Sequence, residues 1–337
     1  MDIDIVLDSH LPAKELAELG VLAEENGIRC LWNASYLEGK DPFCNMVPLA
    51  MATSRIKIAP MALNGYEMHP YRMAMSLMTL NEFASGRVET MIGGGGEVVM
   101  SLDMPFNKRV RYVREAVEFV KGATTQRPFS YDGELFRIKD YNPTWPEAEP
   151  PFVYAAANLP QTLSMAAKAA DGAFMSDLSP GLAKGAIDAV HSRMDEIGRD
   201  KSSFRFNNFM TMYVYDDLAE ARHEARRWIG YRAIFREYMM REFMDADEFQ
   251  QILDHIPQIY AMAPKNESYV EGLDDELLER TIDHLTMTGT PDDLDKIIEH
   301  LLEYKALGMT EVCIELKKHK VKNLKLLGER IIPALKD

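Results

Sequence analysis

A run of four glycines followed by an acid is the part of this sequence best suited to chemistry. Gly93, Gly94, Gly95 and Gly96 come directly after a short apolar run, and Glu97 follows them. Residues without a Cβ let the backbone approach a planar ring or a phosphate closely. Such a run at the end of a strand favours a ligand-binding loop over a loose connection, and Glu97 would then be placed for acid–base work. A solvent-exposed glutamate is the alternative interpretation of Glu97.

The spacing of these glycines differs from that of the common dinucleotide motif. No register of the run places a third glycine where G-x-G-x-x-G requires one, and the run follows the fourth expected strand, not the first. The sequence also contains no G-x-S-x-G, G-x-x-x-x-G-K-[ST] or H-E-x-x-H motif. Its three cysteines, Cys30, Cys44 and Cys313, form no C-x-x-C pair. We therefore expect no metal site, serine nucleophile or Walker-type nucleotide site.

Charge and composition narrow the possible partners. The chain has 337 residues, with 38 basic and 53 acidic side chains and a net charge of −15. A field of that sign repels phosphate backbones and anionic lipid, so we expect neither a nucleic-acid nor a membrane partner. The acidic start of the chain, the absence of a long apolar window and the sparse cysteines predict a cytoplasmic protein.

Short apolar runs alternate with amphipathic segments along the whole chain. This alternation predicts parallel strands joined by helices, and hence one (β/α)8 barrel domain over residues 1–337. The segment from about 230 to 284 has helical periodicity only and predicts a helical insertion over one end of the barrel. A doubly wound open sheet is the alternative, but it would need fewer strands and a phosphate motif in its first turn. The expected strands are 3–7, 28–32, 56–61, 88–92, 152–156, 173–176, 204–214, 285–288 and 311–316.

Active sites of such barrels lie at the carboxyl ends of the strands, so residues there are the candidates. Asp8 ends the first strand, and we expect it to face the substrate. Its alternative roles are to order a loop or to cap the helix that begins near Pro12.

Three long segments of the chain resemble the bacterial luciferase-like superfamily. They are IKIAPMALNGYEMHP with TLNEFASGR and ETMIGGGGE, then PPFVYAAANLPQTLSMAAKAADGAFMSD, and finally LTMTGTPDDLDKIIEHLLEYKALGMTEVCIEL with KNLKLLGERIIPAL. Within that superfamily the chain is similar to the coenzyme F420-dependent branch of methylenetetrahydromethanopterin reductases and F420-dependent dehydrogenases. The resemblance covers nearly all of the chain outside 230–284. It implies a (β/α)8 barrel with insertions and a homodimer.

The resemblance also implies which residues bind the cofactor. Family members carry a non-proline cis peptide bond at the end of the third strand, against the deazaflavin or flavin ring. Here that place matches Met61-Ala62 or Ala62-Leu63, and the glycine run would line the cofactor. Glu97 matches the glutamate that donates a proton in F420-dependent sugar-phosphate dehydrogenases. The positions that match the binding site for the ribityl and phosphate portions are Ala156, Ala157, Asn158, Ser176 and Asp177.

One departure from the family pattern bears on the chemistry. After the second strand the family commonly reads Trp-x-x-Asp-His, whereas this chain has Trp32, Ser35 and Tyr36 at those places. We expect Trp32 to contact substrate. Tyr36 is a neutral acid at pH 7 and would donate a proton or a hydrogen bond, which favours reduction of a substrate over oxidation of an alcohol. Packing of Tyr36 against the ring is the alternative.

The resemblance therefore implies an F420-dependent oxidoreductase that exchanges a hydride between the deazaflavin C5 and a small organic substrate. Of the two directions, we expect it to act as a reductase. A two-component monooxygenase that uses FMN and dioxygen is one alternative, and a non-catalytic flavin-binding barrel is another. The basic side chains after the last strand would hold the phosphate or the oligoglutamate tail of F420, or else form a solvated charge run; they are Lys317, Lys318, Lys320 and Lys322.

Overall fold

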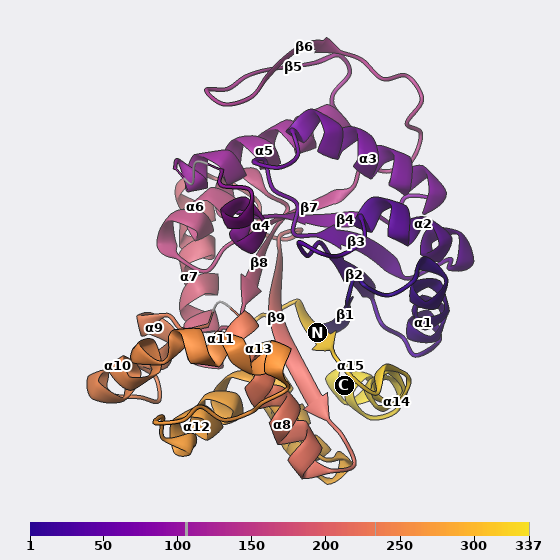
Figure 1. Ribbon diagram of the computed structural model, residues 1–337. Helices are drawn as coiled ribbons and strands as arrows, with labels where there is room; N and C mark the ends of the chain where they lie inside the picture. The colour runs from indigo at the N-terminus through magenta and orange to yellow at the C-terminus, as the bar shows by residue number, and fades with distance from the viewer. Residues whose placement is uncertain (105–106, 233, 337) are drawn as a thin grey trace.

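The computed structural model describes residues 1–104, 107–232 and 234–336, apart from the side chain of Glu97. Eight parallel strands form a barrel in the order β3-β2-β1-β11-β9-β8-β7-β4 (Figure 1). Isolated parallel bridges from Ile58 to Val88 and from Leu63 to Ile92 join β3 to β4 and close the ring. The expected (β/α)8 fold is confirmed. The strands are β1 (Asp2–Leu7), β2 (Cys30–Ala34), β3 (Lys57–Met61), β4 (Glu89–Ile92), β7 (Phe152–Ala156), β8 (Gly172–Ser176), β9 (Arg205–Val214) and β11 (Glu311–Leu316).

Three further strands lie outside this ring. β5 (Phe129–Asp132) and β6 (Arg137–Tyr141) form an antiparallel hairpin at the edge of the molecule (Figure 1). The strand expected at 285–288 is the short β10 (Met287–Gly289), which pairs only with the carboxyl end of β9. It therefore extends the barrel wall at that end without adding a full strand to it.

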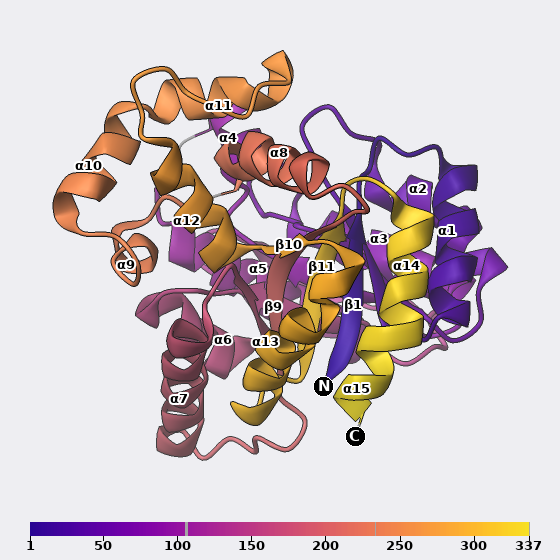
Figure 2. The ribbon, with the colours of Figure 1, turned by 90° about the horizontal axis from the view of Figure 1, so that it is seen from below.

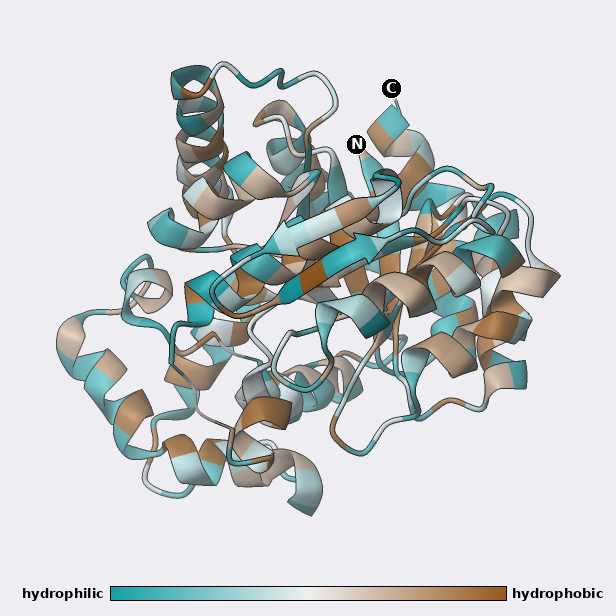
Figure 3. Ribbon diagram, turned by 90° about the horizontal axis from the view of Figure 1, so that it is seen from above, coloured by the Kyte–Doolittle hydropathy of each residue, from teal (hydrophilic) through white to brown (hydrophobic). Residues whose placement is uncertain are grey.

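Helices surround the barrel and carry both hydrophilic and hydrophobic residues (Figure 3). Four of them begin at a proline, whose missing N–H costs nothing at the first helical position. The helices outside the insertion are α1 (Ala13–Glu25), α2 (Pro42–Ala52), α3 (Pro70–Phe83), α4 (Gly96–Ser101), α5 (Arg109–Thr125), α6 (Pro160–Ala169), α7 (Pro180–Glu196), α8 (Leu218–Trp228), α13 (Leu294–Ala306), α14 (Lys320–Leu326) and α15 (Ile332–Lys336).

The insertion is helical, as expected. Within the described residues of 230–284 there are helices and no strand, and they lie together beside α8, away from α1–α3 (Figures 1 and 2). They are α9 (Glu237–Met240), α10 (Ala246–Asp254), α11 (Ile256–Lys265) and α12 (Asp275–Leu285). That residues 1–337 form one domain stays a prediction.

The alternation of side chains along each strand separates two cores. In β1, Ile3, Ile5 and Leu7 pack against the helices, whereas Asp4 and Val6 face the barrel interior. The inner core is rich in aromatic and sulfur-containing side chains: Val6, Cys30, Trp32, Ala34, Ala59, Met61, Met91, Tyr154, Phe174 and Cys313.

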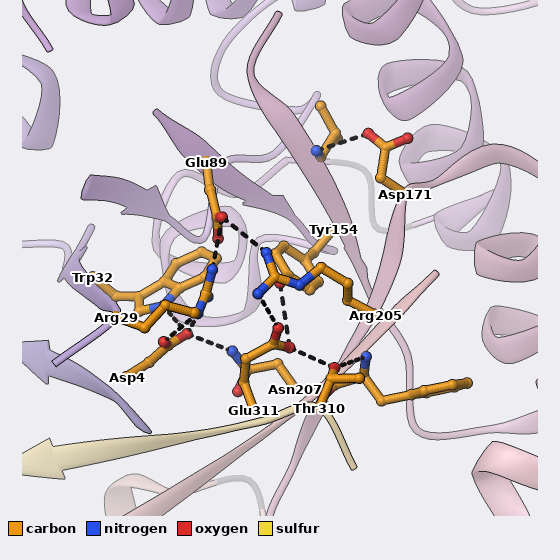
Figure 4. Close-up of polar contacts among 12 residues, drawn as sticks. Asp4, Arg29, Trp32, Glu89, Tyr154, Asp171, Arg205, Asn207, Thr310 and Glu311 are labelled. Atoms are coloured by element: carbon orange, nitrogen blue, oxygen red, sulfur yellow. Dashed lines mark hydrogen bonds and ion pairs between the residues drawn. The ribbon is translucent and has the colours of Figure 1, made fainter. Parts of the chain in front are cut away.

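A network of buried charges fills the amino end of the barrel (Figure 4). Arg29 donates to both carboxylate oxygens of Asp4, over 2.8 and 2.6 Å, and to Glu89 over 2.7 Å. Arg205 reaches Glu89 over 3.3 Å and forms an ion pair with Glu311. Three carboxylates and two guanidinium groups thus link β1, β4, β9, β11 and the residue before β2 at the end opposite to the expected site, where they serve stability.

The pH dependence of stability should expose this network. Burial outweighs the attraction of Arg29 and Arg205 and raises the pKa of Glu311 from 4.5 to about 7. Because the folded state then holds this proton more tightly than the unfolded state, its contribution to stability is complete below pH 4.5 and is lost as the pH rises to about 7. As the pH rises from 4.5 to about 7, we expect the wild type to lose on the order of 3 kcal/mol of unfolding free energy that Glu311→Gln does not lose. Urea titrations of both proteins at several pH values measure it, and parallel curves would contradict it.

Candidate functional site

Three carboxyl ends of strands meet at a surface made of very small residues. The Met61–Ala62 peptide bond is cis, at the first of the two predicted places. A Cβ built on Gly93, after β4, would lie 3.3 Å from the Cβ of Ala156 in β7 and 3.6 Å from the Cβ of Ala62. We call Ala62, Gly93 and Ala156 the small-residue platform. Ala62 and Ala156 are half-buried and Gly93 is buried, so the three residues themselves contribute nothing larger than a methyl group. The Met91 sulfur lies 3.6 Å from the Cβ position built on Gly93 and borders the platform.

The rest of the glycine run has identifiable structural causes. A Cβ on Gly94 would overlap the guanidinium of Arg109. Gly95 (φ 82°) and Gly96 (φ 45°) adopt the left-handed conformation, and Gly95 caps α4. Glu97 belongs to α4, but its side chain lies outside the described part of the structure, so its acid–base role stays a prediction.

Hydrogen bonds tie the ends of β7 and β8 together. The Asn158 amide donates to the Ser176 carbonyl over 2.8 Å and accepts from the Ser176 N–H over 2.9 Å. The Ser176 hydroxyl donates to Asp177 over 2.7 Å. Buried Asp177 also forms an ion pair with Arg232, from the start of the insertion. The structure thus brings together the polar residues predicted after these strands and places the insertion against them.

Three predicted contacts are corrected by the direction of the side chains. Leu63 and Ala157 pack into the core between strands and helices, so only their backbone can face a ligand. Trp32 is 0% exposed, lies inside the barrel and donates from its indole to Asp4 over 2.9 Å. It cannot contact substrate in this structure. The physical reason is its inward position in the middle of β2, where it meets Tyr154 and Phe174 edge-on.

Asp8 serves the loop after β1. Its carboxylate accepts from the His10 N–H over 2.7 Å and contacts the His10 ring at 2.5 Å. Partial burial alone would raise the pKa of Asp8, but these contacts prevail and lower it. The residue that caps α1 is Pro12, so the capping alternative is wrong. Whether Asp8 also contacts substrate stays a prediction.

A buried carboxylate that the sequence analysis did not single out lies at the end of β11. Glu315 is 5% exposed and accepts a hydrogen bond from the Tyr36 hydroxyl over 3.0 Å. The Lys317 ammonium lies 2.7 Å from the same carboxylate oxygen. A signal for Glu315 was present, because it shares the inward-facing parity of Glu311 and Cys313 in an otherwise apolar strand.

The charges around this pair set its protonation state. Burial would raise the pKa of Glu315, but Lys317, Arg232 and the Tyr36 hydroxyl outweigh it and lower that pKa. Burial, followed by the Glu315 charge and hydrogen bond, raises the pKa of Tyr36 well above its usual value. The resting pair is therefore an ionised carboxylate beside a neutral phenol.

Three of the four predicted lysines after β11 pair with carboxylates. Lys317 pairs with Glu315, Lys318 with Glu220 and Glu224, and Lys322 with Asp216. Lys320 donates to the Lys317 carbonyl over 2.6 Å. These contacts favour a stabilising role for the lysines at the end of the barrel over a role in binding an anionic tail.

Within residues 1–104, 107–232 and 234–336, no three His, Cys, Asp or Glu side chains are grouped so that they could hold a metal ion. No helix in this described part of the chain is long and apolar enough to cross a membrane.

Comparisons with known proteins extend over nearly the whole chain. The family model described as luciferase-like monooxygenase matches residues 2–311. The 5,10-methylenetetrahydromethanopterin reductase of Archaeoglobus fulgidus is 25% identical over 320 residues, which cover 94% of each protein.

Solved structures share the barrel fold. The coenzyme F420-dependent tetrahydromethanopterin reductase from Methanopyrus kandleri superposes with a TM-score of 0.81 at 20% identity, covering 99% of each chain. An F420-dependent secondary alcohol dehydrogenase in complex with an F420-acetone adduct gives a TM-score of 0.75 at 18% identity over 100% of each chain.

Proposed function

Since this chain belongs to the luciferase-like monooxygenase family, we propose that it is an oxidoreductase that uses coenzyme F420 to exchange a hydride with a small organic substrate. The relatives whose names include F420 or a tetrahydromethanopterin reductase support this choice of cofactor. A homodimer in the cytoplasm, expected from the sequence, stays a prediction.

The observation that carries the proposal is the small-residue platform. A flat ring system needs a surface without projecting side chains, and Ala62, Gly93 and Ala156 supply one from three adjoining strand ends. The cis bond between Met61 and Ala62 lies at its edge. The residues present therefore fit a deazaflavin or a flavin.

The residues of this chain would divide the work of binding. The platform would support the ring system, and Asn158 and Ser176 would hold the polar portion of the cofactor beyond it. When bound, the deazaflavin supplies a carbon, C5, that accepts or gives up a hydride. The protein's task is then to orient the substrate and to handle the proton that accompanies the hydride.

The geometry bears on the direction of the reaction. The reductive direction rested on Tyr36 as a proton donor, but its single hydroxyl proton is already donated to Glu315 over 3.0 Å. We therefore do not assign Tyr36 the role of proton donor.

Binding titrations distinguish the candidate functions. We expect oxidised F420 to bind with a micromolar Kd, read from the quenching of its fluorescence, and FMN to bind at least about tenfold more weakly. Tight FMN binding without F420 affinity would favour the two-component monooxygenase instead. Binding of neither cofactor would favour a non-catalytic barrel.

A further inference from the structure

The contact between Tyr36 and Glu315 lies beside the small-residue platform. The N–H of Ser35, next to Tyr36, donates to the carbonyl of Met61, whose bond to Ala62 is cis. Tyr36, Ala62 and Ala156 all pack against the same end of the inner core. Tyr36, whose side chain is half-buried, thus lies at the same end of the barrel as the platform, where a substrate would meet a ring system held on the platform.

The hydrogen bond has a direction. A phenol carries one proton and two acceptor lone pairs, and the proton of Tyr36 is donated to Glu315 over 3.0 Å. Towards any other partner the Tyr36 oxygen is consequently an acceptor. It can receive a hydrogen bond from a hydroxyl or amine of a substrate, but it has no proton left to offer a carbonyl.

Charged and polar groups from the elements packed against Glu315 keep its carboxylate ionised. Lys317 lies 2.7 Å from its carboxylate on the same strand end. From β9, the Thr211 hydroxyl is 3.5 Å away and donates to its other oxygen, and Tyr213 is a further neighbour. Arg232 of the insertion contacts Thr211, and although burial lowers its pKa to about 10, it stays positive at neutral pH.

Other groups face Tyr36 itself. The carboxylate of Asp8 adds to the negative potential around the phenol. The His10 ring stacks on the Tyr36 ring with centroids 6.3 Å apart, and the Lys317 ammonium lies 6.0 Å from the ring centroid. These contacts fix the ring while its hydroxyl points at Glu315.

We propose that Tyr36 and Glu315 form a proton relay that runs from the substrate into the protein, and that the substrate bears a hydroxyl or amine hydrogen on the atom next to its reacting carbon. The proposal rests on the proposed function, which supplies the hydride acceptor. The X–H bond of the substrate breaks and its proton moves to the Tyr36 oxygen, while the proton of Tyr36 moves to Glu315. The electron pair left on X forms the C=X bond as the hydride leaves carbon for the deazaflavin. Glu315 ends as a neutral acid and later returns its proton to water.

The relay assigns two different roles. Tyr36 is the catalytic residue, because it contacts the substrate, and Glu315 is a positioning residue that acts through it. We expect Glu315→Gln and Tyr36→Phe to lower kcat for alcohol oxidation about 100-fold while KM and the Kd for F420 change less than about threefold. The assay uses oxidised F420 with a panel of primary and secondary alcohols and amines.

A readout independent of turnover follows the phenol itself. In protein labelled with 13C at the tyrosine Cζ, the signal missing from Tyr36→Phe identifies Tyr36. We expect Glu315→Gln to lower the pKa of Tyr36 in an alkaline titration, because it removes the neighbouring negative charge. The control is Glu311→Gln, the same change on the same strand at the other end of the barrel, which should leave this titration and kcat unaltered.

Each outcome has a distinct meaning. An unchanged pKa of Tyr36 in Glu315→Gln overturns the relay whether or not F420 binds, and it needs no substrate. If the wild-type protein binds F420 but oxidises none of the alcohols and amines, the proposed substrate class is wrong. Failure of wild-type protein to bind F420 overturns the proposed function instead. If Glu315→Gln does not fold, Tyr36→Phe keeps the ring packing and still tests the loss of kcat.

Discussion

Replacing Gly93 with valine should lower the affinity for F420 by at least about 100-fold, a loss of about 2.7 kcal/mol of binding free energy. A Cβ at this position already lies 3.3 Å from that of Ala156 and 3.6 Å from that of Ala62, so the two further methyl groups must project over the platform. The φ angle of Gly93 is not positive, so its backbone is not in the left-handed conformation that disfavours a side chain. The fluorescence titration that measures wild-type affinity also measures the variant.

The matched control is Gly185→Val in α7. Gly185 is exposed, and nothing lies within 4 Å of a Cβ placed on it. We expect this variant to bind F420 as the wild type does. Wild-type affinity in a folded Gly93→Val protein would mean that the cofactor does not rest on the platform, and the proposed function would lose its main support.

Replacing Asp4 with alanine should have the largest effect on stability, a loss of about 3–5 kcal/mol in the free energy of unfolding. Asp4 is 0% exposed and accepts from Arg29, from the Trp32 indole over 2.9 Å and from the Asn207 amide over 2.8 Å. Alanine would remove the carboxylate that binds Arg29 through two oxygens, although Arg29 keeps Glu89. It would also leave the Trp32 and Asn207 donors without this acceptor. Urea denaturation followed by circular dichroism measures the difference.

An exposed ion pair provides the comparison. The side chain of Asp295 is 84% exposed and lies 3.2 Å from Arg330. Water and salt screen such a pair, so Asp295→Ala should leave the denaturation midpoint almost unchanged. Equal losses in the two variants would show that the buried network contributes no more than a surface pair does.

The network and the relay are chemically similar but lie at opposite ends of the barrel. Glu311 and Glu315 share one strand and one face, and both are buried. Burial prevails at Glu311 and raises its pKa, whereas Lys317, Arg232 and Tyr36 prevail at Glu315 and lower its pKa. The same residue type thus holds its proton to a higher pH at one end of the barrel and stays ionised to a lower pH at the other.

Local patterns were sufficient to predict the barrel. The expected strands 152–156 and 311–316 coincide with β7 and β11, because an apolar run bounded by turn residues has few other ways to bury its side chains. The resemblance to the luciferase-like superfamily implied a cis bond at Met61-Ala62 or Ala62-Leu63, and the first place is the one observed. The glycines at 93–96 stood out in the sequence itself. Strand starts were less accurate: the run at 28–32 became Cys30–Ala34, because Ile28 already packs into the outer core.

The side chains that would act on substrate were harder to predict. Trp32 was assigned to substrate because of its place in a motif, yet its indole lies inside the barrel against Asp4. Glu315 was overlooked because an acid in an apolar strand does not reveal which residues surround it. Arg232 belongs to the insertion, which the resemblance to the superfamily does not cover. Only its contacts with Asp177 and Thr211 place it near the site.

By itself the sequence determined the order of strands and helices, the barrel they form and the glycines that leave room for a flat ligand. These features depend on periodicity and residue size, which can be read from consecutive residues of the sequence. Only the tertiary structure decided that the Tyr36 hydroxyl donates a hydrogen bond to Glu315 and that Lys317 and Arg232 keep this carboxylate ionised. It also decided that Trp32 is enclosed in the barrel. The partners in these contacts are up to 279 residues apart, and their energies depend on distances and burial that exist only once the barrel closes.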